Sequence, residues 1–236
     1  MALHHNPRIV TSGLVLALDA ADSNSYPGSG TTWYDLSGNG NHFTLYNTPI
    51  FSDGYFDFNG TNEYARSTNT LDLSPYDSVS VEVTFRANTT STPTGMLFEH
   101  SSNWNNQTMG FGLVPNTVSS TNYVNNSHHT NQYYGAGATN YDGVIGLDIT
   151  THTNIWSRVS DSNGRLAYIN STERTIGDSS TSEYPSFRDD YFFIASRNGQ
   201  SVWYNVKVYS LKIYGSKLSS QEIQQNYNAT KTRFGL

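Results

Sequence analysis

The side chains in this sequence that are best suited to chemistry are carboxylates and amides gathered in two short polar segments. Each segment brings three oxygen-bearing side chains close together along the chain: Asp19, Asp22 and Asn24 in the first, and Asn59, Asn62 and Glu63 in the second. Calcium binds oxygen atoms of Asp, Glu and Asn, so each segment is a candidate calcium site. Asp and Asn also cap tight turns, and a purely structural role in a turn is the alternative.

Aromatic side chains in polar segments form a second group of candidates, because aromatic rings stack on the faces of sugars. The candidates are Trp104, Tyr123, Tyr133, Tyr134 and Trp203. Three of them fall in residues 116–140, an Asn-rich segment with little apolar periodicity, and a loop of that length is uncommon unless it binds something or is partly disordered. Packing against another protein chain is the alternative, since Tyr and Trp are enriched in protein interfaces.

A glycan-cleaving site would need a pair of carboxylates, one acting as an acid and the other as a nucleophile or base. Two carboxylates that alternate along a strand would share one face and could form such a pair. Glu82 and Glu99 both lie in strand-like segments, but neither has a carboxylate two residues away. We therefore predict that the protein is not an enzyme, and a glycan hydrolase is the least favoured alternative.

Composition argues against several classes of partner. The 236-residue chain has a net charge of −6 and no basic cluster, whereas nucleic-acid binding requires concentrated Lys and Arg. No apolar run reaches the roughly 20 residues that a membrane-spanning helix needs, so we expect no membrane insertion. The first residues lack the basic start and apolar core of a signal peptide, and Cys is absent, so we expect folding in a cytoplasm without disulfides.

Alternation of apolar and polar residues with a period of two dominates the sequence and predicts β-strands. Residues 79–85 alternate Val and Phe with Ser, Glu and Thr, which predicts a strand with one buried and one solvent-facing side. In residues 202–214 the apolar phase shifts, so we predict a bulge near Tyr209 and Ser210. Asn-Gly and Asp-Gly pairs between the strands predict hairpin turns, and the whole pattern indicates a single all-β sandwich.

A helix is predicted near the C-terminus. Ser219 and Glu222 have the spacing of a capping box, in which each side chain bonds the backbone N–H of the other residue. Ile223 and Tyr227 stand four residues apart on one face of this helix and should dock on the sandwich. The helix should end between residues 228 and 230.

Five segments, taken in chain order, resemble the laminin-G/concanavalin-A-like domain family. They are residues 13–19 with the loop Asp35-Leu-Ser-Gly-Asn-Gly-Asn41, residues 56–64, residues 79–85, residues 156–169 and residues 211–227. The last of these is similar to the family's terminal strand and short helix, Ile-Tyr-x-x-x-Leu-Ser-x-x-Glu-Ile-x-x-x-Tyr. The ending over residues 226–236 is similar to copies found in virion proteins of tailed bacteriophages.

This resemblance implies an all-β fold, a concanavalin-A-like jelly-roll β-sandwich of two antiparallel sheets with one short C-terminal helix. We expect a single domain over residues 13–236. The polar residues and Pro7 within residues 1–12 predict an extended N-terminal arm that docks on a neighbouring subunit.

The resemblance also implies a function. We expect a non-enzymatic bacteriophage virion structural protein, which is located on the particle as a capsid decoration, fibre or tail component. Its expected partners are other virion proteins or further copies of itself, together with host-surface polysaccharide. A carbohydrate-binding module for host recognition is the alternative.

Overall fold

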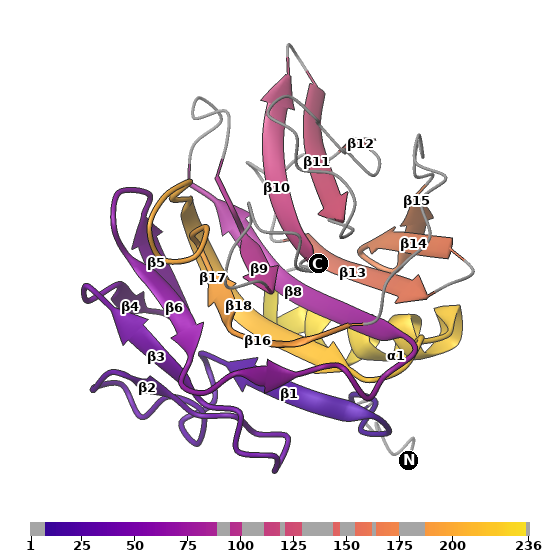
Figure 1. The fold of residues 1–236 in the computed structure, drawn as a ribbon, viewed down its shortest axis with the longest axis horizontal. Helices are drawn as coiled ribbons and strands as arrows, with labels where there is room; N and C mark the ends of the chain where they lie inside the picture. The colour runs from indigo at the N-terminus through magenta and orange to yellow at the C-terminus, as the bar shows by residue number, and fades with distance from the viewer. Residues whose placement is uncertain are drawn as a thin grey trace, which may run out of the picture.

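The computed structural model describes residues 8–88, 95–100, 111–118, 121–128, 144–146, 154–161, 164–174 and 187–234 (Figure 1). Within these residues, two eight-stranded antiparallel sheets form a sandwich. Sheet A has the order β15 (Thr172–Arg174), β14 (Gly164–Ile169), β13 (Asn154–Asp161), β8 (Val79–Ala87), β18 (Asn205–Tyr214), β5 (Tyr55–Asn59) and β4 (Ile50–Ser52), and β1 (Leu14–Asp19) also pairs with β18.

Sheet B and four further elements complete the described fold. Sheet B has the order β12 (Val144–Gly146), β11 (Thr121–His128), β10 (Phe111–Val118), β9 (Phe98–His100), β17 (Phe192–Ile194), β6 (Tyr64–Ser67), β3 (Phe43–Tyr46) and β2 (Thr32–Trp33). The remaining elements are the pair β16 (Asp189–Asp190) and β7 (Leu71–Asp72), the helix α1 (Ser220–Thr230) and the 3₁₀ turn η1 (Lys231–Phe234). The predicted all-β sandwich with a short C-terminal helix is confirmed.

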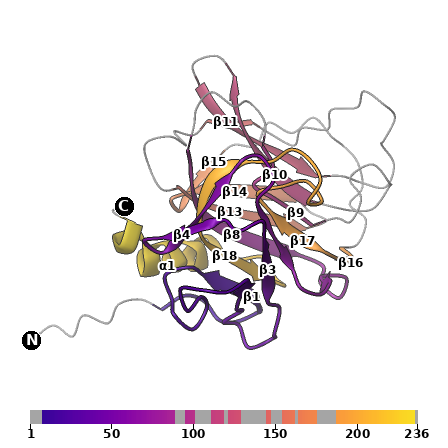
Figure 2. The same cartoon turned by 90° about the vertical axis from the view of Figure 1, so that its left-hand side faces the viewer.

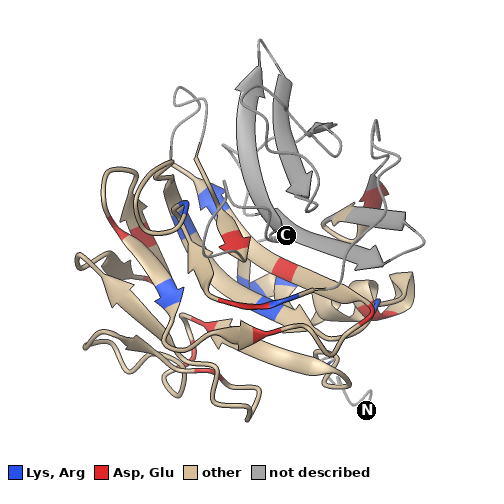
Figure 3. Ribbon diagram, viewed as in Figure 1, with Lys and Arg blue, Asp and Glu red and all other residues tan. Residues whose placement is uncertain are grey.

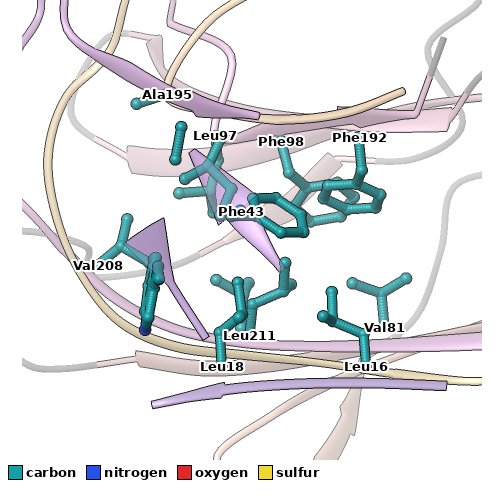
Figure 4. Packing of buried hydrophobic residues seen from close by; sticks show 14 of the residues in the cluster. Leu16, Leu18, Phe43, Val81, Leu97, Phe98, Phe192, Ala195, Val208 and Leu211 are labelled. Carbon is teal, nitrogen blue, oxygen red and sulfur yellow. The ribbon is translucent and has the colours of Figure 1, made fainter. Parts of the chain in front are cut away.

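The core between the sheets is built from the apolar phase of the alternating strands. Sheet B contributes Phe43, Phe98 and Phe192, which face Leu16 and Val81 of sheet A (Figure 4). All five side chains are at most 2% exposed. Burying an apolar side chain of this size stabilises the fold by about 1.5–3 kcal/mol, so these rows hold the sheets together. They also fix which side chains of sheet B point away from the core, because successive residues of a strand point to opposite faces.

The bulge predicted in the last strand is confirmed. In β18 the register against β8 shifts between Val208 and Ser210. One edge of β18 pairs with β5 before this point and with β1 after it. The extra residue keeps the apolar side chains on the core side of both halves, and Val208 and Leu211 are both fully buried.

The loop 35–41 closes the free edge of β1. The carboxylate of Asp35 accepts the backbone N–H of Ala17 at 2.9 Å and that of Asn41 at 3.0 Å. The side-chain amide of Asn41 donates to the carbonyl oxygen of Val15 at 2.9 Å. Because β1 pairs with β18 on its other edge, these side chains take the place of a missing neighbouring strand.

The helix α1 covers the outer face of sheet A, on the side turned away from sheet B (Figure 2). The predicted capping box is present between Ser219 and Glu222. Ile223 is buried as predicted, but the second buried position of the helix is Asn226, while Tyr227 is only half buried. In the described part of the chain no helix is long and apolar enough to cross a membrane.

The prediction that residues 79–85 have a solvent-facing side is wrong. Glu82 is 1% exposed, and Lys212, which stands opposite it on β18, is 5% exposed. The two side chains form an ion pair, and the amide of Asn226 donates to the second carboxylate oxygen of Glu82 at 3.0 Å. The helix supplies a cover that alternation along a single strand does not show, and it brings its own polar partner.

Residues 8–12, which belong to the predicted arm, pack onto this helix. The N–H of Val10 donates to the side chain of Asn226 at 2.7 Å, and its carbonyl oxygen accepts the hydroxyl of Tyr214 at 3.2 Å. Val10 is buried with Tyr214 and Ile223 in a small second cluster. This part of the predicted arm is therefore tied to the sandwich, and residues 1–7 lie outside the described residues.

Candidate functional site

The side chains of β3 and β6 that point away from the core place aromatic rings and a cation on the outer face of sheet B. In β3, Phe43 is buried in the core, so Tyr46, three residues on, points to the opposite face. In β6, Ala65 points into the core, and its neighbours Tyr64 and Arg66 point outward. Each outward side chain is half buried.

We name five half-buried side chains on and beside this face the sheet B cluster: Tyr46, Tyr64, Arg66, Tyr191 and Trp203. Tyr46 and Tyr64 are opposite each other across β3 and β6, and their rings stack with 4.4 Å between centroids and an angle of 1°. The Trp203 ring lies 5.8 Å from that of Tyr64. The three rings pack in a row, although they come from distant parts of the sequence.

The cation of the cluster is held by ring contacts. The guanidinium carbon of Arg66 lies 4.4 Å from the centroid of Tyr191 and 5.3 Å from that of Tyr46. Burial raises the pKa of the Tyr64 hydroxyl. Charge repulsion from an ionised Tyr46 raises this pKa further, whereas the positive charge of Arg66 lowers it. The Tyr64 hydroxyl is therefore neutral at ordinary pH and is able both to donate and to accept a hydrogen bond.

An acidic residue lies two strands from Arg66 on the same face. Glu99 of β9 stands opposite Phe193 of β17, which in turn stands opposite Arg66, and Figure 3 shows the acidic position in β9 and the basic position in β6. Burial raises the pKa of Glu99 to about 8, although the N–H of Asn198 at 2.7 Å and the charge of Arg197 act in the opposite direction. At pH 7 this carboxyl is therefore mostly protonated.

The structure tests the predicted aromatic contacts only in part. Trp203 belongs to the sheet B cluster, and Tyr123 lies in β11. Trp104, Tyr133 and Tyr134 lie outside the described residues. A sugar or subunit contact at these positions stays a prediction.

Sequence reasoning missed four members of the cluster, Tyr46, Tyr64, Arg66 and Tyr191. A signal for two of them was present. Tyr46 and Arg66 stand at the polar phase of short alternating strands, where a large aromatic ring or a cation faces away from the core. Their meeting with Tyr191 depends on the order of strands in sheet B, which alternation within one strand does not reveal.

The first candidate calcium segment forms a set of turn contacts. Asp19 pairs with Arg233 at 2.6 Å and accepts the N–H of Ala21 at 3.0 Å. One carboxylate oxygen of Asp22 accepts both the backbone N–H and the side-chain amide of Asn24, at 2.8 and 3.0 Å. The contacts to Ala21 and Asn24 are the ones expected from the turn-capping alternative, whereas the ion pair with Arg233 ties Asp19 to the C-terminal turn.

The second candidate calcium segment is arranged in a similar way. The side-chain oxygen of Asn59 accepts the N–H of Thr61 at 2.8 Å, its amide donates to Asn62 at 3.1 Å, and its own backbone N–H donates to the carboxylate of Glu63 at 2.8 Å. The described residues contain no group of three or more His, Asp or Glu side chains placed to hold a metal ion. Calcium binding that uses the Asn side chains of either segment stays a prediction.

Comparisons with known proteins identify the fold. Neither protein-family models nor curated proteins match the sequence. A mutant of Trypanosoma rangeli sialidase with trans-sialidase activity matches 97% of this chain with a TM-score of 0.66 and 14% identity. The same sialidase in complex with sialic acid matches 94% of this chain with a TM-score of 0.65 and 14% identity. The receptor-binding domain of botulinum neurotoxin C/D mosaic serotype matches 92% with a TM-score of 0.63 and 13% identity.

What these proteins share with this chain is the fold. The match covers 34% and 33% of the two sialidase chains and 51% of the toxin chain, so this chain corresponds to only a part of each. These likenesses bear out the jelly-roll sandwich predicted from the sequence. At such low identity they assign no residue of this chain to a role.

The prediction that the protein is not an enzyme is overturned by the same comparisons. It rested on the missing pair of alternating carboxylates, but the similar structures include sialidases, whose chains carry a glycosidase activity. Paired carboxylates on one strand are one arrangement for glycan cleavage, and sialidases use a Tyr nucleophile instead. The missing pair therefore excludes no enzyme.

Proposed function

We propose that this chain is a bacteriophage virion protein whose sandwich recognises glycans through the sheet B cluster. The observation that carries glycan recognition is the gathering of four aromatic rings and a cation on one outer sheet face. The virion setting is supported by the ending over residues 226–236, which resembles copies of the laminin-G/concanavalin-A-like domain in tailed-phage virion proteins. The two parts of the proposal rest on different observations and are tested separately.

The chemistry of the cluster suits a sugar ligand. Aromatic faces pack against the C–H faces of sugar rings, while Tyr hydroxyls and the indole N–H bond the sugar hydroxyls. Tyr46, Tyr64, Tyr191 and Trp203 are each half buried, so part of each side chain stays accessible to a ligand. The toxin structure that this chain resembles in fold is a receptor-binding domain, which is consistent with a recognition role.

A glycan array with the full chain tests the recognition part. We expect binding to one class of glycan, reduced at least tenfold by Tyr46→Ala. Tyr55→Ala is the matched control, because Tyr55 is a half-buried Tyr on sheet A that packs beside a cation, Lys207, at 4.7 Å. An array without any binding, or equal losses in the two variants, would contradict glycan recognition by the sheet B cluster.

Two further readouts complete the test. Release of reducing ends from the bound glycan would show that recognition is joined to cleavage. Mass spectrometry of purified phage particles tests the virion setting, and absence of the protein from the particles would contradict it.

A further inference from the structure

Arg66 lies in the sheet B cluster with strands on both sides. It stands in β6 opposite Thr44 of β3 and Phe193 of β17. Its guanidinium contacts the rings of Tyr191 and Tyr46 at 4.4 and 5.3 Å. A ring contact orients the planar guanidinium, while the N–H donors in its plane stay able to bind a ligand.

Two lysines of sheet A differ from Arg66 because each has a carboxylate partner. Lys207 has the carboxylate of Asp57 at 3.9 Å, and Lys212 is paired with Glu82. Within the described residues, the guanidinium of Arg66 forms no hydrogen bond and no ion pair, and its Nε is buried without an acceptor. A charged donor left in this state lowers the stability of the fold, and an anion bound to the terminal N–H groups of the guanidinium would compensate its charge.

We infer that Arg66 binds the carboxylate of an acidic sugar. The guanidinium presents two parallel N–H donors, which match the two oxygens of a carboxylate. The rings of Tyr46, Tyr64 and Trp203 beside it offer apolar contact to the C–H groups of the sugar that carries the carboxylate. This inference rests on the glycan recognition proposed above and names the class of sugar recognised.

The surroundings of Arg66 favour an anion. Thr44 and Phe193, its neighbours across the sheet, are uncharged. The acidic residue further along the same row, Glu99, is mostly protonated at pH 7 because burial raises its pKa to about 8. An acidic peptide would also satisfy the charge, but it would leave the aromatic rings beside Arg66 without a role.

The inference is tested by titration calorimetry with matched pairs of ligands. The probes are oligomers of galacturonic acid, glucuronic acid and 2-keto sugar acids, each beside its carboxyl-reduced form, and a poly-glutamate peptide. The proteins are the full chain, Arg66→Gln, Arg66→Lys and the control Lys207→Gln. Thermal melting of each variant shows that it is folded, and Arg66→Lys retains the charge while removing the paired donors.

We expect an acidic oligomer to bind at least tenfold more tightly than its reduced form. Arg66→Gln should abolish that preference, Arg66→Lys should weaken it, and Lys207→Gln should retain it. Equal binding of a glycan and its reduced form would overturn the acidic-sugar inference but leave glycan recognition standing. Binding to poly-glutamate as tight as to the acidic sugar would also overturn it, and absence of binding to any glycan would overturn the proposed function itself.

Discussion

The two outer faces of the sandwich differ in whether a cation on them has an anionic partner within the described residues. On sheet A, Lys212 and Glu82 are buried together under α1, and Asn226 of that helix completes their hydrogen bonds. On sheet B, Arg66 is half buried among aromatic rings, without an anion among the described residues. The buried ion pair of the first face is satisfied within the chain, whereas Arg66 on the second face keeps an uncompensated donor, which is the arrangement expected of a binding surface.

The largest expected effect is a change of the free energy of unfolding with pH, which is caused by Glu99 on sheet B. An unfolded Glu titrates near 4.5, and burial raises the pKa of Glu99 to about 8, so the folded protein holds the proton more tightly. Its contribution to stability is full below pH 4.5 and is lost as the pH rises towards 8. The loss approaches about 5 kcal/mol, at roughly 1.4 kcal/mol per pH unit.

Glu99→Gln should remove this pH dependence, which urea denaturation between pH 4.5 and 9 would show. Asp53→Asn, at an exposed acidic position, is the control and should follow the wild-type curve. If the free energy of unfolding of Glu99→Gln changed with pH in parallel with that of the wild type, Glu99 would already be ionised at neutral pH. The face around Arg66 would then carry a negative charge of its own.

Lys212→Met probes the closed face of sheet A. The change leaves the carboxylate of Glu82 buried without its ion-pair partner, which costs about 3–5 kcal/mol. Combining it with Glu82→Leu removes both charges, so the double variant should be more stable than Lys212→Met. Chemical denaturation measures both, and a loss below about 1 kcal/mol for Lys212→Met would show that water reaches this pair.

Asn226→Ala tests the contribution of the helix to that face. The side chain accepts from Val10 and donates to Glu82 and to the hydroxyl of Tyr214, so its removal should cost about 2–3 kcal/mol. Asn228→Ala, two residues on, loses one exposed hydrogen bond and should cost less than about 0.5 kcal/mol. Equal melting temperatures for the two variants would contradict the proposed role of Asn226.

The smallest expected change in stability is that of Arg66→Gln. The variant loses two ring contacts, worth about 0.5–1 kcal/mol each at exposed sites, and gains by removing an unpaired buried donor. We expect a net change within about 1 kcal/mol by denaturation. A loss as large as that of Lys212→Met would instead make Arg66 a structural residue.

Local features of the fold could be predicted from the sequence. The shift of apolar phase placed the bulge of β18, and the spacing of Ser219 and Glu222 placed the start of α1. Each of these depends on neighbours within a few residues. The jelly-roll prediction combined such local signals with segments that resemble a known family.

The burial and the contacts of side chains on the outer faces could not be predicted in the same way. Glu82 stands in an alternating segment that suggests a wet face, and only the docking of a helix from the end of the chain buries it. Arg66 meets Tyr46 and Tyr191 because β6 lies between β3 and β17, an order set by the folding of the entire sheet. Alternation shows that a side chain points outward but not which side chains it will meet.

The central claim is that the outer face of sheet B is the ligand-binding surface. Amide chemical shifts of the full chain, recorded during titration with the glycan that gives the strongest array signal, test it most directly. We expect the largest shifts in β3, β6 and residues 191–203. Largest shifts in the loop 35–41 or in α1, with β3 and β6 unchanged, would contradict it.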